Sequence, residues 1–382
     1  MVRGPLAVVL GDLDLVSCLG MAGVRCVAVA APDDPVRFSR FTQTVIDRPT
    51  DDAALVDTLL EFARRLVARP VLFYQTDRDL LLVSREREAL AVGYDFVIPD
   101  PALVEDLVDK GRFQALAARL ELPVPAARQI RAGQGHAAIV DLRFPVVVKA
   151  ATRNGLDQLA IAGKAVAVET PDQLRALMGE LSRTDIELLA QELVVGDETA
   201  VESYHGYVDS FGFICAEFTG AKIRTSPATF GYSTALRTSH APDLMTAGRR
   251  LVARLGFTGV LKVDYKRDHR GALHLLEVNP RFSLWNHLGA AAGVNLPALV
   301  YADLTGRLRP DLSPARPGVT WCQLGGDRKA AVDAGVSTTS WAAWAALTRA
   351  RAEGRWSDPA PLLRGIVWPR LIRAVRPAPS PS

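Results

Sequence analysis

The chain has 382 residues, which suggests two or three domains rather than one core. Hydrophobic residues make up 49%, enough for a sizeable interior, while a net charge of +3 is too small to indicate a nucleic-acid partner, and we expect none. Four cysteines without metal-site spacing do not make a disulfide framework. Because the sequence shows neither an export signal nor an apolar run long enough to span a bilayer, we expect a cytoplasmic protein without a transmembrane span.

The first hundred residues alternate predicted strands with predicted helices. Apolar runs predict strands at 6–10, 24–30 and 71–74, and helical spacing predicts helices at 14–21, 53–68 and 79–90. This βαβα order predicts a right-handed, doubly wound parallel sheet of the α/β class. The first strand is followed by Gly11-Asp12-Leu13-Asp14 and not by GxGxxG, which disfavours nicotinamide binding. Asp12 and Asp77 follow strands, where they either contact substrate or cap helices.

Beyond Pro99 the pattern changes to α+β. A helix is predicted at 103–120, and strands are predicted at 144–150, 165–168 and 187–194, with a helix at 171–181. Two hairpins follow, 199–208 with 211–218 and 259–265 with 272–278, separated by a helix at 244–255. The signal weakens after about residue 310, and the Pro-rich tail from Pro377 is predicted to be disordered.

The second hairpin carries the strongest chemical signal. Asp264 and Glu277 are expected on neighbouring strands, and Asn279 shares a face with Glu277 because it lies two residues further on. Three oxygen donors in one cluster are the ligands that Mg²⁺ prefers. The alternative is a solvated strand face with ordinary acids.

Two lysines and the run 191–198 indicate a nucleotide-binding site beside that cluster. Lys149 ends the apolar strand Pro145-Val146-Val147-Val148, where a cation suits a phosphate, and Lys110 occurs in a predicted helix. The run Gln191-Glu192-Leu193-Val194-Val195-Gly196-Asp197-Glu198 can present backbone groups to adenine and the Glu198 carboxylate to ribose. A surface charge is the alternative for each lysine, and it is stronger for Lys110.

These motifs, in this order, resemble the ATP-grasp superfamily. The residues that carry the resemblance are Asp109-Lys110, the run 145–149, the run 191–198, Asp264, and Glu277-Val278-Asn279-Pro280-Arg281. The separation of Asp264 from Glu277 is similar to that in D-alanine–D-alanine ligases, and the Tyr-His-Gly-Tyr-Val-Asp run at 204–209 resembles carboxylate–amine ligases of the D-aspartate ligase type. The resemblance implies a pre-ATP-grasp domain at 1–105, an ATP-grasp domain at 106–310 with a small lid subdomain at about 125–195, and a C-terminal extension at 311–382.

The resemblance also implies roles for single residues. Phosphates are contacted by Lys110 and Lys149, adenine by Gln191, Glu192 and Val194, and ribose by Glu198; Mg²⁺, or Mn²⁺ in its place, is held by Asp264, Glu277 and Asn279; Lys262 and Arg281 are catalytic cations. One departure is the loop after Lys149, which is poor in glycine, so that Arg153 would replace backbone amides with side-chain charge.

The activity expected from this resemblance is an ATP- and Mg²⁺-dependent joining of a carboxylate to an amine through an acyl phosphate. Arg224 and Arg237, in a basic stretch that begins at Lys222, are expected to clamp the acid, although a solvated loop is the alternative. Small molecules, such as an amino acid or a peptide, are the expected partners, and a homodimer is compatible with the sequence. Biotin-carboxylase-like carboxylation and a non-catalytic ATP-binding regulatory module remain as alternatives.

Overall fold

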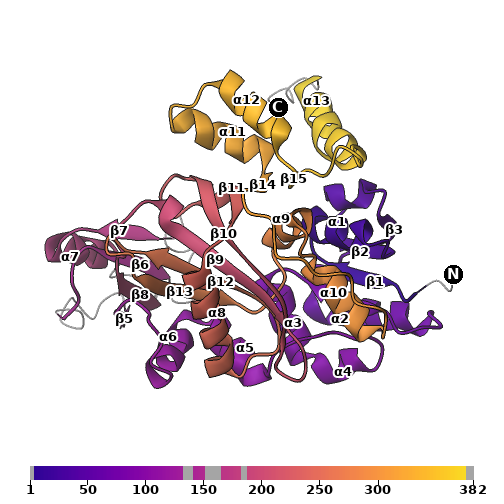
Figure 1. Ribbon diagram of the computed structural model, residues 1–382, viewed down its shortest axis with the longest axis horizontal. Coiled ribbons are helices and arrows are strands. Elements are labelled where there is room, and N and C mark those ends of the chain that lie inside the picture. Colours follow the sequence, from indigo (N-terminus) through magenta and orange to yellow (C-terminus); the bar gives the residue numbers. More distant parts are fainter. Residues whose placement is uncertain (1–3, 132–140, 151–164, 182–186, 376–382) are drawn as a thin grey trace, which may run out of the picture.

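Three parts of the chain are arranged around one site. The structure is a computed structural model that describes residues 4–131, 141–150, 165–181 and 187–375. In Figure 1 the N-terminal part lies at one end, two antiparallel sheets lie at the other, and the C-terminal part covers the junction between them. None of the described helices has the length and apolar character that crossing a bilayer requires.

The N-terminal part is a four-stranded parallel sheet. Its strands β1 (Ala7–Leu10), β2 (Cys26–Ala30), β3 (Thr42–Asp47) and β4 (Val71–Tyr74) lie in the order β3-β2-β1-β4. The helices are α1 (Leu13–Met21), α2 (Asp52–Arg64), α3 (Asp77–Arg85) and α4 (Arg87–Ala91), with a 3-10 turn η1 (Pro35–Phe38). The predicted parallel sheet is confirmed, but β3 was not predicted, because this edge strand is mostly polar. The helix predicted at 79–90 is divided at Glu86.

A small antiparallel sheet follows two consecutive helices. The helices are α5 (Pro101–Val108) and α6 (Lys110–Arg119), and the sheet holds β5 (Ala127–Arg131), β6 (Val146–Ala150), β7 (Val166–Val168) and β8 (Glu187–Glu192), with α7 (Pro171–Glu180). The single helix predicted at 103–120 is wrong, because Asp109 has an extended backbone and its side chain accepts a hydrogen bond from the Arg112 amide. Lys110 is therefore the first residue of a helix.

The large sheet has seven strands in the order β13-β12-β9-β10-β11-β14-β15. They are β9 (Val201–Val208), which follows the 3-10 turn η4 (Glu198–Ala200), β10 (Ile214–Ser226), β11 (Tyr232–Ser239), β12 (Gly259–Arg267), β13 (Leu273–Asn279), β14 (Thr320–Cys322) and β15 (Ala350–Arg351), and α8 (Pro242–Leu255) packs on one face. Both predicted hairpins are confirmed. The stretch 222–233, expected to be a loop, instead forms the end of β10, a turn and the start of β11.

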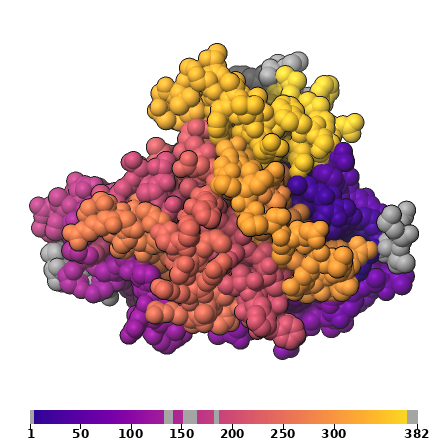
Figure 2. Space-filling view, viewed as in Figure 1, coloured from indigo at the N-terminus to yellow at the C-terminus, as the bar shows by residue number. Residues whose placement is uncertain are grey.

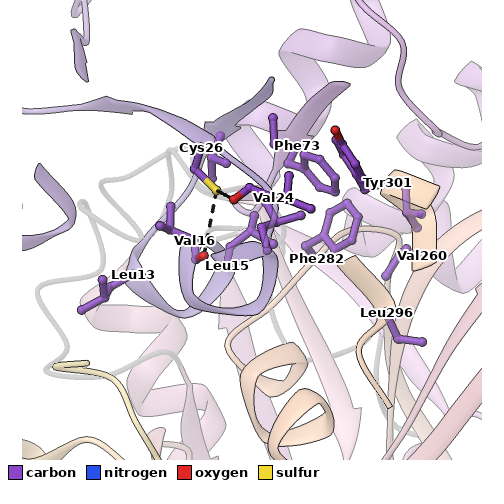
Figure 3. Close-up of a cluster of buried hydrophobic side chains, with 14 of the residues drawn as sticks. Leu13, Leu15, Val16, Val24, Cys26, Phe73, Val260, Phe282, Leu296 and Tyr301 are labelled. Carbon is purple, nitrogen blue, oxygen red and sulfur yellow. Dashed lines mark hydrogen bonds between the residues drawn. The ribbon is translucent and has the colours of Figure 1, made fainter. Parts of the chain in front are cut away.

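An apolar core joins the parallel sheet to the large sheet. Helices α9 (Trp285–Ala292) and α10 (Leu296–Leu304) pack against α1. Figure 3 shows Phe73 of β4 beside Phe282, which follows β13, with ring centroids 5.2 Å apart. Both rings are buried, and a fully buried phenylalanine contributes about 1.5–3 kcal/mol through the hydrophobic effect. The two sheets therefore share one packed interior beneath the site.

The C-terminal part is attached to both sides of this junction. It contains α11 (Leu324–Asp333), α12 (Thr338–Leu347), a π-helical segment η5 (Pro361–Val367) and α13 (Trp368–Val375). Asp327 of α11 pairs with Arg224 of β10, while Asp358 accepts hydrogen bonds from Ser39 Oγ at 2.5 Å and from the Arg40 amide at 3.1 Å. Figure 2 shows this part, in yellow, resting against the indigo N-terminal domain.

Candidate functional site

The hairpin of β12 and β13 sets four polar side chains on one face of the large sheet. Asp264 lies opposite Glu277, and Lys262 lies opposite Asn279, so all four side chains leave the sheet on the same side. The alternate residue Val263 is buried in the apolar cluster on the other side of the sheet, together with residues of α8. The hydrophobic pattern of β12 thereby fixes the direction in which the acids point.

Lys262 lies between the two carboxylates. Its Nζ atom is 2.5 Å from Asp264 Oδ2 and 3.7 Å from a Glu277 oxygen, while Ser203 of β9 donates a hydrogen bond to the other Asp264 oxygen. Burial acts to lower the pKa of Lys262, but the two carboxylates outweigh it and raise that pKa above its usual value. Lys262 is therefore a fixed cation at neutral pH.

The same acids fit a hard divalent cation. Burial is the main cause that raises the pKa of Asp264, and it opposes the lowering effect of Lys262. Burial also acts to raise the pKa of Glu277, but Lys262 and hydrogen bonds hold that pKa well below its usual value. No group of three or more His, Cys, Asp or Glu side chains among the described residues is arranged to hold a metal ion, so the third oxygen donor here would be the Asn279 amide. The donor set fits Mg²⁺. The Lys262 ammonium places a positive charge beside the same two carboxylates.

Two of the residues predicted to contact nucleotide lie together in the small sheet. Lys149 Nζ donates to Gln191 Oε1 at 3.0 Å. Burial lowers the pKa of Lys149, although the charges of Glu277 and Glu198 act to raise it, which also indicates that the two sheets face each other across this lysine.

Three other residues that the sequence predicts to contact nucleotide lie in or beside the same sheet. Lys110 Nζ donates to the Ala150 carbonyl at 2.6 Å, and Glu192 pairs with Arg143 at 2.8 Å. Val194 is buried, and its N–H and C=O have no backbone partner among the described residues, so they are available to a purine edge. Arg153 lies outside the described residues.

Two further lysines face the same region. Lys222 begins the basic stretch that was expected from the sequence to contact the acid, whereas the sequence pattern gave Lys266 no role. Lys222 Nζ is 3.4 Å from Glu198, which opens the turn before β9. Burial lowers the pKa of Lys266, against the raising effect of Glu198. Each of these lysines has apolar or aromatic residues near it on its strand, β10 or β12. On β12, Lys266 shares one strand face with Lys262 and Asp264, and this alternation is the signal that identifies it.

A cavity of about 520 Å³ separates this face from the N-terminal sheet. On the side of the large sheet it is lined by Lys222, Gly231, Tyr232, Ser233, Lys262, Asp264, Glu277, Asn279, Arg281, Ser283, Leu284 and Trp285. The opposite wall comes from the carboxyl ends of the parallel strands and includes Gly11, Asp12, Ala30, Asp34, Arg48, Gln75, Thr76 and Asp79. Ligands commonly bind at that edge of an α/β sheet.

Charged residues of the N-terminal wall also face this cavity. Arg48 pairs with Asp79, which is buried, and Asp79 also accepts a hydrogen bond from Thr76. Asp12 as a whole residue is exposed, but protein atoms crowd its carboxyl group, and this desolvation together with the nearby Asp14 charge raises the pKa of Asp12 to about 7. Asp12 also caps α1 by accepting a hydrogen bond from the Asp14 amide, which is one of the two interpretations of this aspartate from the sequence.

Arg281 connects the two walls. Its guanidinium pairs with Asp77 at the start of α3, and it donates to the Gln75 carbonyl at 3.1 Å and to Asn279 Oδ1 at 3.2 Å. A predicted catalytic cation and a predicted strand-end aspartate therefore meet, although 204 positions separate them in the sequence.

Arg224 and Arg237 do not line the cavity. Arg224 forms two hydrogen bonds with Asp327, at 2.8 and 2.7 Å, and its guanidinium stacks on Trp344. Arg237 is exposed and pairs in register with Ala221, one residue before Lys222, so it leaves the sheet on the opposite side. The expectation that both lie near the cleft is thereby corrected, because 222–233 is strand where a loop was expected.

Of the aromatic and histidine residues near the site, Trp285 lines the cavity, whereas His205 and His287 are buried in the packing around it. His287 is fully buried and contacts Asp14 through Nδ1 at 2.7 Å. His205 lies between the rings of Phe218 and Trp285, and burial together with Lys262 lowers its pKa well below the usual value. His205 is therefore a neutral packing residue beside the cation.

A four-stranded parallel N-terminal sheet followed by antiparallel sheets is typical of one class of protein. Residues 224–324 match the family described as "ATP-grasp in the biosynthetic pathway with Ter operon". The chain belongs to the ATP-grasp superfamily, and it is an ATP-grasp enzyme of the ATP-dependent ligase type, related distantly to D-aspartate ligase and D-alanine–D-alanine ligase. ATP-grasp proteins use ATP with Mg²⁺.

Individual relatives are distant. The chain is 23% identical to D-aspartate ligase from Enterococcus faecium over 300 residues, which cover 74% of this chain and 71% of that protein. Biotin carboxylase from Campylobacter jejuni has a similar structure, with a TM-score of 0.63, 13% identity, and coverage of 83% of this chain and 74% of that one. L-amino acid ligase from Bacillus licheniformis gives a TM-score of 0.62 at 14% identity, covering 84% and 79%. These two structures show a shared fold.

Proposed function

We propose that the chain is an ATP- and Mg²⁺-dependent ligase that joins a carboxylate to an amine through an acyl phosphate and releases ADP and phosphate. The observation that carries this proposal is the single cavity in which Lys262 and the acidic hairpin face Arg48 and Asp12. One wall suits a transferring phosphoryl group, and the other suits a small charged acceptor. The distant similarity to D-aspartate ligase supports the same reaction class.

The nucleotide would lie between the small sheet and the large sheet. In this proposal Lys110, Lys149 and Lys222 contact phosphates, Gln191, Glu192 and Val194 line the adenine pocket, Arg153 contributes charge, and Glu198 contacts ribose. Asp264, Glu277 and Asn279 would hold Mg²⁺, with Mn²⁺ as a substitute, and the bound ion would neutralise charge on the triphosphate.

The reaction proceeds in two balanced steps. A carboxylate oxygen attacks the γ-phosphorus of ATP, the bond to the bridging oxygen breaks, and ADP leaves. The amine nitrogen then attacks the acyl carbon and loses a proton, and phosphate leaves with one oxygen of the original carboxylate. Lys262 and Arg281, held by Asp264 and Asp77, are fixed cations for the charge that develops in both steps.

The N-terminal wall favours an amino acid as one substrate. A guanidinium carries five N–H donors. Among the described residues, only Asp79 accepts a hydrogen bond from the Arg48 guanidinium, and it does so from one nitrogen. The remaining donors suit a carboxylate, while Asp12 on the same wall suits an ammonium group once it is ionised. Arg224 and Arg237 have no part in this proposal, because neither lines the cavity.

Trapping the intermediate tests the proposal without knowing the amine. The full chain is incubated with MgATP, hydroxylamine and single amino acids, and both hydroxamate and ADP are measured. Hydroxylamine captures an acyl phosphate, so at least one acid should give equal amounts of hydroxamate and ADP. Glu277→Gln should abolish both, while Glu61→Gln, which changes an exposed glutamate on α2, should leave both unchanged.

Three results would contradict the proposal. Nucleotide binding without ADP release for any acid would favour a regulatory module. ADP release that requires bicarbonate would favour carboxylation. Full activity of Glu277→Gln would remove the hairpin from the mechanism.

A further inference from the structure

The last helical segment of the chain turns an apolar face to the outside. Four large apolar side chains of η5 and α13 are exposed: Leu363 by 54%, Val367 by 38%, Trp368 by 63% and Leu371 by 54%. Trp356, in the preceding loop, is 74% exposed, and the Arg351 guanidinium stacks on its ring. We call the four residues Leu363, Val367, Trp368 and Leu371 the C-terminal apolar face. In Figure 1 this segment lies at the outer edge of the C-terminal part.

The opposite side of the same segment is fixed to the N-terminal domain. Gly365 packs so closely on η1 that a Cβ atom there would lie 2.8 Å from the Pro35 Cα atom. Pro361 is buried, and Asp358, which is 2% exposed, is held by Ser39 and Arg40. One side of the segment therefore packs on the N-terminal domain, and the C-terminal apolar face remains exposed.

The charge of this segment has one sign. Residues 359–382 contain Arg364, Arg370, Arg373 and Arg376 and no Asp, Glu or Lys. Arg364 and Arg370 are exposed next to the apolar side chains. Tryptophan and leucine beside arginine on an exposed helix are typical of segments that lie in the interface of a bilayer, where the rings enter the headgroup region and the guanidinium groups meet lipid phosphates.

We propose that the C-terminal apolar face binds the surface of an anionic lipid bilayer and holds the enzyme there as a peripheral protein. The charge complementarity between an acid-free arginine segment and anionic headgroups favours a lipid surface over a second copy of the chain, which would place like charges together. This proposal is independent of the proposed ligase reaction, because no residue of the face lines the cavity.

Vesicle sedimentation tests the proposal directly. The full chain is mixed with sucrose-loaded vesicles of equal parts phosphatidylglycerol and phosphatidylcholine, and the fraction that sediments with them is measured, with pure phosphatidylcholine vesicles in parallel. Binding to the anionic vesicles should be about tenfold stronger or more and should weaken as salt is added. Tryptophan fluorescence should shift to shorter wavelength on binding, since Trp368 belongs to the face.

Matched pairs of variants separate the face from the rest of the surface. Leu363→Ser/Leu371→Ser should lower binding about tenfold or more, because apolar area no longer enters the interface. Phe211→Ser/Phe213→Ser, which changes two apolar residues at the β9–β10 turn that are 83% and 70% exposed, should have no effect.

A second pair of variants removes two arginines and changes no apolar residue, and it has a matched control pair. Arg364→Gln/Arg370→Gln should weaken binding to anionic vesicles alone, whereas Arg64→Gln/Arg250→Gln, with the same change in net charge at exposed sites, should not.

Several outcomes would overturn the proposal. The chain would remain in the supernatant with anionic vesicles, or the serine pair on the C-terminal apolar face would bind as well as the unchanged chain. A dimer in vesicle-free solution that this serine pair dissociates would show that a second copy covers the face. Circular dichroism verifies that each variant is folded.

Discussion

Removing Asp327 should destabilise the C-terminal part far more than removing a surface acid from the same helix. The Asp327 side chain is 0% exposed and accepts hydrogen bonds from Arg224, from Thr234 Oγ1 at 3.0 Å and from Trp341 Nε1 at 2.9 Å. Asp327→Ala leaves the Arg224 guanidinium, 17% exposed, without its partner charge. Breaking a buried ion pair by removing one member costs about 3–5 kcal/mol.

Asp333→Ala is the matched control on α11. Its carboxylate is 55% exposed and pairs with Lys329 at 2.7 Å, so the loss should be about 0.5 kcal/mol or less. Urea unfolding followed by tryptophan fluorescence measures both variants, because Trp341 and Trp344 lie on α12 of this part and Trp341 donates to Asp327. Equal midpoints for the two variants would refute the assignment of Asp327 as the attachment between α11 and β10.

Three further predictions concern the N-terminal wall and the core. Because the pKa of Asp12 is raised from 3.8 to about 7, the folded chain keeps a proton that the unfolded chain releases; the free energy of unfolding should therefore fall as pH rises through this window, and Asp12→Asn should remove that part of the slope in urea titrations at several pH values. Arg48→Gln should raise the KM of the amino-acid substrate by about tenfold or more while the KM of ATP stays constant, and Arg64→Gln should change neither; a parallel rise in the KM of ATP would remove Arg48 from the acceptor site. Phe282→Ala should lower the free energy of unfolding by about 3–5 kcal/mol, because its buried ring packs on Phe73; a loss below about 1 kcal/mol would contradict the shared core.

The acidic hairpin could be predicted from sequence because its signal is local. Alternation along Val263-Asp264-Tyr265 fixes the face of each residue, and the polar stretch before Leu273 allows only a turn. The structure pairs Asp264 with Glu277, and the register shifts by one residue directly beside this pair, where Tyr265 lies opposite Leu275. The buried parallel strands were equally clear, since their apolar runs need no partner to be recognised.

Other features depend on tertiary contacts that the sequence pattern does not contain. The apolar spacing at 103–120 continues through Asp109, and only the cap at the Arg112 amide shows that one helix ends there and another begins. The edge strand β3 has little apolar character to detect.

The N-terminal wall of the site also depends on tertiary contacts that the sequence pattern does not contain. Arg48 has no motif around it, and it becomes a candidate only because the parallel sheet and the large sheet enclose one cavity. Arg224 shows the reverse case: its place in a basic, turn-rich stretch suggested a clamp for the acid, but the fold pairs it with Asp327.

Oxygen transfer is the most direct test of the proposed reaction. An amino acid labelled with ¹⁸O in its carboxylate is incubated with the full chain, MgATP and hydroxylamine or an accepted amine, and the released phosphate is examined by mass spectrometry. The account predicts one ¹⁸O atom in each phosphate that accompanies ADP, because the acyl phosphate keeps a carboxylate oxygen. Release of ADP with unlabelled phosphate would contradict it.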